Sequence, residues 1–287
     1  MKRLFAGVAL SMATVVIAAA PAQAAPKNPV ATLKQQLRPD TGVKFIDRAI
    51  MTEKGRRDLF LRRTGTFEFS KSGLAASDIT GKFNILASDI PEDAPEELKA
   101  MFSPERTIRV GTTSYLSGGL FSTMLPEDKT WLKMPKGPTG GLTGIYGQPV
   151  NLVEQATYKT LLKSGKPGKG AYTGSITFGE LYKVSPWLRA SIFDKPKAKA
   201  LKSVLTWKLQ LDGKGLPARL VTTFPVSALG MTGSKGTTLT VDTRYTGWGA
   251  KVDIKAPAAD EVSSKLKDGT DELPDGIPLP DGSTVSQ

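Results

Sequence analysis

Few side chains in this sequence could do catalytic chemistry. The chain contains no histidine and no cysteine, so it lacks the commonest general base and any thiol nucleophile or thiolate metal ligand. The remaining candidates are two acid pairs and one Ser-x-x-Lys spacing: Glu96/Glu97, Asp89/Glu92 and Ser264/Lys267. The acids lie in polar stretches typical of solvated helix starts, and the serine lies where the apolar pattern ends. We therefore predict a non-enzymatic protein with no catalytic residue, no metal site and no cofactor.

The chemistry that the sequence does support is apolar binding. Large apolar and aromatic residues recur at every second position of several stretches, which places them on one face of a strand. Such residues facing inward could line a pocket for an acyl chain. The candidate ligand-binding residues are Phe45, Leu61, Phe67, Phe69, Phe83, Ile176, Phe178 and Trp207 from predicted strands, and Leu152 and Leu161 from a predicted helix. The alternative is that they form an ordinary filled core.

Antiparallel hairpins must position these side chains. The stretch 59–69 puts Leu61, Phe67 and Phe69 on one face and charged or polar residues on the other, and 79–85, 172–178, 205–211 and 239–245 repeat the pattern. Helical spacing is predicted over 29–38, 92–101, 152–162 and 186–202. Strict alternation of strand and helix is absent, which argues against a parallel sheet.

These elements predict an α+β fold that is mainly β. We expect a large, strongly curved antiparallel sheet, an unclosed barrel, with two or three helices on its concave face. Gly65, Gly81 and Gly174 lie inside predicted strands, where they would permit bends. The glycine-rich run 136–147 lacks the order of a phosphate-binding loop, so we interpret it as a flexible connection.

The two ends of the chain differ from its middle. Residues 1–24 combine two cations, an apolar run and Ala22-Gln23-Ala24, which predicts a signal peptide cleaved after Ala24; an uncleaved anchor is the alternative. Residues 266–287 are rich in acids and prolines, which predicts a disordered acidic tail. One domain is expected over 25–265, secreted or held in an extracytoplasmic compartment of the cell envelope.

The net charge of +12 indicates acidic partners. For an exported protein we expect an anionic membrane surface rather than nucleic acid, and a monomer; a basic surface that only keeps the protein soluble is the alternative.

Three motifs in the second half of the chain occur in a specific order. They are the strand pair with a polar turn over Thr112–Met134 (TTSYLS…LPEDKTWLKM), the hairpin TWKLQLDGKGLPARL over Thr206–Leu220, and the ribbon YTGWGAKVDIKAPAADEV over Tyr245–Val262. In this order they resemble the LppX/LprAFG-like lipoprotein family, which has a LolA/LolB-like fold. The chain departs from that family in one respect: Ala24 and Ala25 occupy the region of the lipobox cysteine, so no acyl anchor forms.

The resemblance implies a bent antiparallel sheet with helices against its concave face and, in some members, a cavity that takes lipids. It also implies that the ribbon Thr243–Pro257 forms the final pair of edge strands of the sheet. The expected function is that of an exported, non-enzymatic binding protein for a lipid or other amphiphile, which it carries in the cell envelope. The alternative is an envelope sensor or interaction protein with a filled core and no ligand.

Overall fold

The computed structural model describes residues 28–85, 88, 90–192, 196–230, 236–271, 273, 277–278 and 284–285. The predicted signal peptide, residues 1–24, lies outside this part of the chain. Twelve of the described strands form one sheet in the order β12-β6-β5-β4-β3-β2-β1-β11-β10-β9-β8-β7. Their bounds are Thr41–Glu53 (β1), Arg56–Ser70 (β2), Gly73–Phe83 (β3), Glu105–Val110 (β4), Thr113–Gly118 (β5), Trp131–Pro135 (β6), Lys166–Gly168 (β7), Ala171–Thr177 (β8), Val204–Leu211 (β9), Pro217–Pro225 (β10), Thr238–Lys251 (β11) and Val262–Ser263 (β12). A separate antiparallel pair joins β13 (Ile277–Pro278) to β14 (Thr284–Val285).

Two meanders meet in the middle of the large sheet. Strands β1 to β6 run outward in chain order, and β7 to β11 return until β11 pairs with β1. All neighbours are antiparallel except β12 and β6, which are parallel. The expectation that the ribbon Thr243–Pro257 forms a pair of edge strands is therefore wrong, because its strand part belongs to β11, which lies between β1 and β10. The pairing of β11 with β1 joins the second meander to the first and makes one sheet of both.

The long strands follow from alternating burial. In β2, Leu61, Arg63, Phe67 and Phe69 are buried, whereas Arg62 and Thr64 between them are exposed. Burying one such apolar side chain contributes roughly 1.5–3 kcal/mol, so a register slip of one residue, which would turn the whole set to solvent, is strongly disfavoured. The register shifts at Ala49/Ile50 and Glu68/Phe69 are bulges, and bulges bend a sheet.

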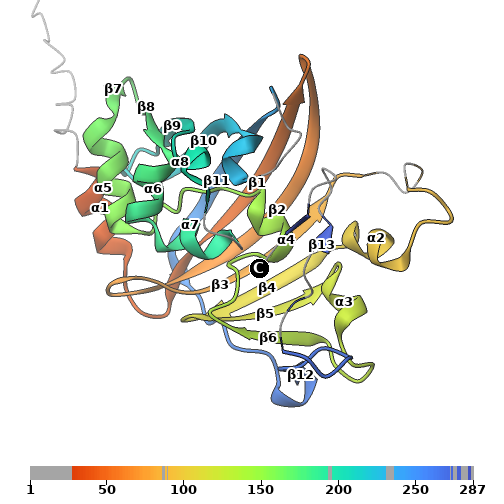
Figure 1. The fold of residues 1–287 in the computed structure, drawn as a ribbon. Helices are drawn as coiled ribbons and strands as arrows, with labels where there is room; N and C mark the ends of the chain where they lie inside the picture. Colours follow the sequence, from red (N-terminus) through yellow and green to blue (C-terminus); the bar gives the residue numbers. More distant parts are fainter. Residues whose placement is uncertain are drawn as a thin grey trace, which may run out of the picture.

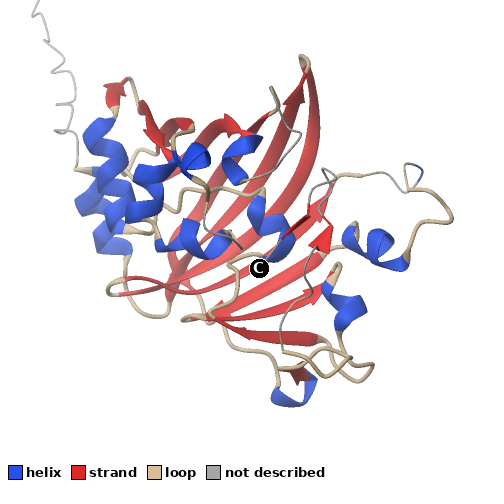
Figure 2. Cartoon of the chain, viewed as in Figure 1, coloured by secondary structure: helices blue, strands red, loops and turns tan. Residues whose placement is uncertain are grey.

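The helices gather on one face of the sheet, which curls around them (Figures 1 and 2). The connection from β6 to β7 contains α4 and α5, and the connection from β8 to β9 contains α6, α7 and α8. The bounds of the helices are Pro29–Gln36 (α1), Glu96–Met101 (α2), Phe121–Met124 (α3), Gly141–Ile145 (α4), Gln155–Ser164 (α5), Phe178–Val184 (α6), Pro186–Ser191 (α7), Ala198–Leu201 (α8), and two 3-10 turns, Val226–Leu229 (η2) and Ala259–Glu261 (η3).

The spacing of Phe178 from Ile176 predicts that Phe178 lies in a strand, but the structure places it in a helix. It is the first residue of α6, because Thr177 and Glu180 form a capping box that ends β8 and starts the helix: the Thr177 hydroxyl accepts from the Glu180 amide, and the Glu180 carboxylate accepts from the Thr177 amide. The side chain of Phe178 is nevertheless buried, with its ring centroid 5.2 Å from that of Phe224.

The predicted fold class is confirmed: one large, unclosed, mostly antiparallel sheet carries helices on its concave face. More short helices cover that face than the two or three expected. Beyond residue 265, Leu266 and Leu273 are buried in the hydrophobic core, although both fall within the predicted tail. Among the described residues, no helix has both the length and the apolar character needed to cross a membrane.

Candidate functional site

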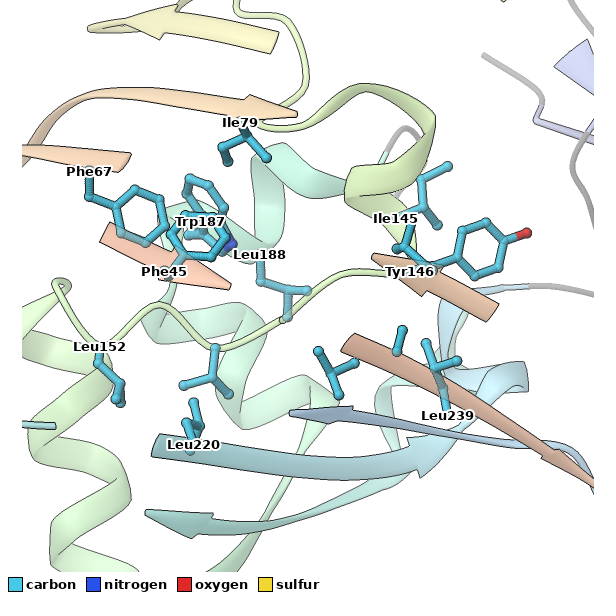
Figure 3. Packing of buried hydrophobic residues seen from close by; sticks show 14 of the residues in the cluster. Phe45, Phe67, Ile79, Ile145, Tyr146, Leu152, Trp187, Leu188, Leu220 and Leu239 are labelled. Atoms are coloured by element: carbon cyan, nitrogen blue, oxygen red, sulfur yellow. The ribbon is translucent and has the colours of Figure 1, made fainter. Parts of the chain in front are cut away.

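The space inside the curved sheet is occupied by the protein's own chain. Residues 137–153, here called the inner segment, are all buried and include the short helix α4. The segment runs between the sheet and the other helices, and Figure 3 shows Ile145, Tyr146 and Leu152 among the core side chains. The interpretation of residues 136–147 as a flexible connection is therefore wrong, because all but Lys136 of that run are packed inside the protein.

Glycines allow the inner segment to lie this close to the sheet. Gly141 has a φ of +57°, and a Cβ there would stand 2.8 Å from a carboxylate oxygen of Glu105 on β4. A Cβ on Gly147 would overlap the guanidinium of Arg63 on β2. The glycines that suggested mobility are thus required by close approach to two buried charged side chains.

Those charged side chains belong to a buried polar cluster between the sheet and the inner segment. Arg63 pairs with Asp47 of β1 through Nε and Nη2, and the two residues are 2% and 1% exposed. Glu105 accepts hydrogen bonds from the backbone amides of Leu142 at 3.2 Å and Thr143 at 2.6 Å. Burial raises the pKa of Glu105 to about 7, although these hydrogen bonds and the charge of Arg63 oppose the rise. The cluster fixes α4 against β4.

Gln148 extends the cluster toward the other half of the sheet. Its side-chain amide donates to Thr243 of β11 at 2.9 Å, and its carbonyl oxygen accepts from Thr222 of β10 at 3.0 Å. A void of about 10 Å³ remains here, lined by residues that include Asp47, Arg63 and Gln148. This is the space of about one water molecule, so the described part of the interior around this cluster is filled.

The ten predicted ligand-binding residues all lie in one buried hydrophobic cluster: Phe45, Leu61, Phe67, Phe69, Phe83, Leu152, Leu161, Ile176, Phe178 and Trp207. In this conformation they contact one another and the helices. Phe45 stacks on Phe67 with ring centroids 4.6 Å apart, and Phe67 meets the edge of Trp187 at 5.3 Å (Figure 3). That they contact a ligand remains a prediction.

An open pocket of about 410 Å³, here called the mouth pocket, lies where the β2–β3 and β4–β5 turns approach α5 and α7. Its size is within the usual range for small-molecule sites. The apolar side chains that line it are Leu74, Ala156, Val184, Pro186, Trp187 and Ala190. Trp187 lines both this pocket and the small interior void, so the two spaces approach each other at this residue.

Arg109 supplies a cation to the mouth pocket. Its Nε donates to the carbonyl of Gly111 and its Nη1 donates to Ser114 and to the carbonyl of Gly137, which leaves Nη2 without a partner among the described residues. None of the ion pairs in the described part of the chain includes Arg109. Burial lowers the pKa of its guanidinium, which still carries a positive charge. Arg109 could therefore bind a carboxylate or phosphate.

Glu154 also lines the mouth pocket, and its carboxylate binds residues of two helices. Its carboxylate accepts from the Ser185 hydroxyl and the Trp187 amide, both at 2.6 Å, and from Thr157 at 2.9 Å. Burial raises its pKa, and these hydrogen bonds oppose the rise. Glu154 therefore joins the start of α5 to the start of α7 and holds Trp187 in place.

The structure places the described members of the acid pairs and of the Ser-x-x-Lys spacing at the protein surface. Glu96 and Glu97 lie in the first turn of α2, and the Glu96 side chain is 81% exposed and pairs with Lys99 at 3.2 Å. Ser264 and Lys267 are exposed, and Asp89 lies outside the described residues. A second pocket of about 550 Å³ lies beside Glu97 and Lys267, with further acids around it. Among the described residues, no cluster of His, Cys, Asp or Glu could hold a metal ion.

Sequence reasoning missed Arg109, Glu154 and Trp187. They come from β4, the cap of α5 and α7, and only the tertiary structure brings them to one pocket. The one sequence signal was an acid, Glu154, in the first turn of the helix predicted over 152–162; its partners Ser185 and Trp187 are distant in sequence and could not be identified from it.

No protein-family profile and no curated protein matches the chain. Solved structures that it resembles include the lipoprotein LppX of Mycobacterium tuberculosis, with 14% identity, 79% of this chain and 98% of that chain covered, and a TM-score of 0.33. A LolA-superfamily protein of Nitrosomonas europaea gives 8% identity, 77% and 91% coverage and a TM-score of 0.28. An outer membrane lipoprotein-sorting protein domain of Vibrio parahaemolyticus has 8% identity, with 76% of this chain and 90% of that chain covered, and a TM-score of 0.25.

Proposed function

We propose that this protein is an exported, non-enzymatic, monomeric binding protein for a lipid or another amphiphile, which it carries in the cell envelope. The observation that supports this proposal is the mouth pocket, whose lining combines six apolar residues with Arg109, a cation that has no ion pair among the described residues. A ligand that matches such a pocket has an anionic group for Arg109 and a hydrocarbon part for Leu74, Val184 and Trp187.

The hydrocarbon chain would continue inward past Trp187. Behind the indole lie Phe45 and Phe67, two of the predicted ligand-binding residues, and the small void that they share with it. Rotation of the indole would open the mouth pocket to these rings. The ten predicted residues would then line the path of the chain.

Native protein extracted with organic solvent and examined by mass spectrometry tests the proposal first. We expect a co-purified amphiphile, and palmitate binding in equilibrium measurements. Ala156→Trp fills the mouth pocket from an exposed position of α5, and we expect it to weaken palmitate binding at least tenfold. Ala256→Trp, at an exposed position outside the pocket, is the matched control and should bind as the wild type does.

Arg109→Gln tests the anionic group of the ligand separately from its hydrocarbon part. A hydrogen bond to a charged group contributes about 1.5–3 kcal/mol, so palmitate should bind about 10- to 100-fold more weakly while hexadecanol is little affected. A lipid-free extract together with folded protein that binds neither palmitate nor hexadecanol would refute the proposal.

An interaction protein without a ligand is the second candidate, and the filled interior favours it. A void of about 10 Å³ admits no hydrocarbon chain without rearrangement. This function predicts that a stoichiometric protein partner is recovered from envelope extracts, that Ala156→Trp does not change its recovery, and that the organic extract contains no lipid.

The mass of the purified exported protein tests the proposed location: cleavage after Ala24 leaves a chain that begins at Ala25.

A further inference from the structure

The face of the sheet turned away from the helices, here called the outer face, carries a row of cations. Arg48 of β1 is paired in register with Arg62 of β2, and Arg62 is paired with Lys82 of β3. Residues paired in register point to the same side of a sheet, and all three side chains are exposed. Lys44 and Arg244, also exposed, lie next to this row on β1 and β11.

Two acids of the outer face, Asp78 and Asp242, are engaged by other arginines, and a third, Glu68, accepts from the backbone amide of Ile254 at 2.7 Å. Asp78 holds Arg106, and Asp242 holds Arg219, each through two hydrogen bonds of 2.7–2.8 Å. Asp242 is opposite Arg48 in register, but both of its oxygens bind Arg219. None of the ion pairs among the described residues includes Arg48, Arg62 or Lys82. Since like charges opposite each other destabilise a sheet, this row has a cost in the free protein that an anionic partner would remove.

One exposed apolar residue lies within this basic surface. Ile46 is 52% exposed on β1 between Lys44 and Arg48, and it is paired in register with Arg244. The other exposed large apolar residues among the described ones are Val110 and Val204, and none of the three is aromatic. The row of Arg48, Arg62 and Lys82 therefore has no exposed aromatic side chain beside it, among the described residues, on which single-stranded nucleic acid could stack. Cations around an aliphatic side chain match a surface of anionic headgroups over hydrocarbon.

We propose that the outer face, centred on Arg48, Arg62 and Lys82, docks onto an anionic phospholipid bilayer. This contact is separate from the mouth pocket, which lies on the helix side of the sheet, and it does not depend on the proposed ligand. In the docked orientation the helices and the pocket face away from the bilayer surface that the sheet contacts.

Co-sedimentation of the purified exported protein with vesicles tests the proposal. We expect binding to mixed vesicles of phosphatidylglycerol and phosphatidylcholine and no binding to vesicles of phosphatidylcholine alone. Binding should be lost at roughly 0.5 M salt, because at that ionic strength the attraction between surface charges is screened within a few ångströms. The triple variant Arg48→Gln/Arg62→Gln/Lys82→Gln should bind roughly 100-fold more weakly, from about fivefold for each cation near an anionic surface.

The matched control removes the same charge from the helix side. Lys159, Lys163 and Lys183 are exposed on α5 and α6, and their replacement by Gln should leave vesicle binding within about twofold of wild type, since these cations do not face the bilayer in the docked orientation. Equal weakening by both triple variants, binding to phosphatidylcholine alone, or no binding of the wild type at low salt would each overturn the proposal. So would DNA or an acidic polypeptide that binds the outer face more tightly than the vesicles do. Circular dichroism confirms that each variant is folded.

Discussion

The buried carboxyl group of Glu105 should make the stability of this protein depend on pH in an unusual direction. Glu105 is 4% exposed, and its carboxylate accepts from the amides of Leu142 and Thr143 on the inner segment. The nearest charge is Arg63, whose own partner is Asp47. Desolvation outweighs these favourable contacts and raises the pKa from 4.5 to about 7. The folded protein therefore binds a proton more tightly than the unfolded chain does.

The sign and size of the effect follow from this difference. Below pH 4.5 the group is protonated in both states, and its contribution to stability is fully present. As pH rises through about 7 the folded state must ionise a buried group, so the free energy of unfolding falls. At 1.36 kcal/mol per pKa unit, the difference between 4.5 and about 7 corresponds to a loss of about 3 kcal/mol by pH 8. Glu105→Gln keeps the size of the side chain and removes its titration.

Denaturant unfolding of the wild type and Glu105→Gln at pH 5, 6, 7 and 8 measures this effect. The stability of the variant relative to the wild type should rise by about 2–3 kcal/mol from pH 5 to pH 8, because a small part of the loss already occurs below pH 5. The chain has no histidine to titrate in this range, and Glu154, whose pKa is also raised, is common to both proteins. Glu96→Gln, at an exposed carboxyl, is the control and should give a curve parallel to that of the wild type. A constant difference between wild type and Glu105→Gln across this range would show that the burial argument is wrong.

Three further changes test the packing of the inner segment and the helix cap. Gly147→Ala places a methyl group against the Arg63 guanidinium and should cost about 1–3 kcal/mol, whereas Gly144→Ala, with open space around it, should cost nothing; equal stabilities would contradict close packing. Asp47→Ala leaves Arg63 buried without its partner and should cost about 3–5 kcal/mol, and Asp47→Leu/Arg63→Met should recover most of it; a double variant as unstable as the single one would count against the pair. Thr177→Ala should cost about 1 kcal/mol through the lost cap of α6; no change would mean that packing alone starts the helix. Denaturant unfolding measures all three.

The sheet was readable from the sequence because its signal is local. Leu61, Phe67 and Phe69 alternate with exposed polar residues within one strand, and this period of two follows from one buried face. The same alternation placed Arg63 on the buried face. Its partner Asp47 could not be found in this way, because the pair forms through the register of β1 against β2, and no local pattern fixes that register.

The prediction of a flexible connection over residues 136–147 is wrong because glycine occurs for two different physical reasons. A glycine-rich run is mobile when nothing surrounds it, and it is closely packed when other groups come too near for a side chain. Which of these holds at Gly141 and Gly147 depends on Glu105 and Arg63, which are distant in sequence. The order of β11 in the sheet was misjudged for a related reason: hairpin motifs identify strands but do not say which strands lie at the edges.

An alkyl chain bound in the mouth pocket has two routes further into the protein, and their costs differ. Displacing the inner segment would break the contacts of Glu105 and Gln148 and uncover the Asp47–Arg63 pair, and uncovering a buried cluster of this kind costs several kcal/mol. Rotating Trp187 breaks the hydrogen bond from its Nε1 to the carbonyl of Gln148, at 3.2 Å, and its edge contact with Phe67.

A neutral hydrogen bond and an aromatic pair contribute about 0.5–1.5 kcal/mol each, so losing these two contacts costs about 1–3 kcal/mol, in addition to any loss of burial of the indole. Burying one methylene group returns about 0.8 kcal/mol, and roughly four methylenes therefore offset even the higher cost. The indole leaves its own volume behind for the chain, next to Phe45 and Phe67. A filled interior in the free protein is thus compatible with binding of a chain longer than about four carbons, whereas an amphiphile with a shorter chain would remain in the mouth pocket.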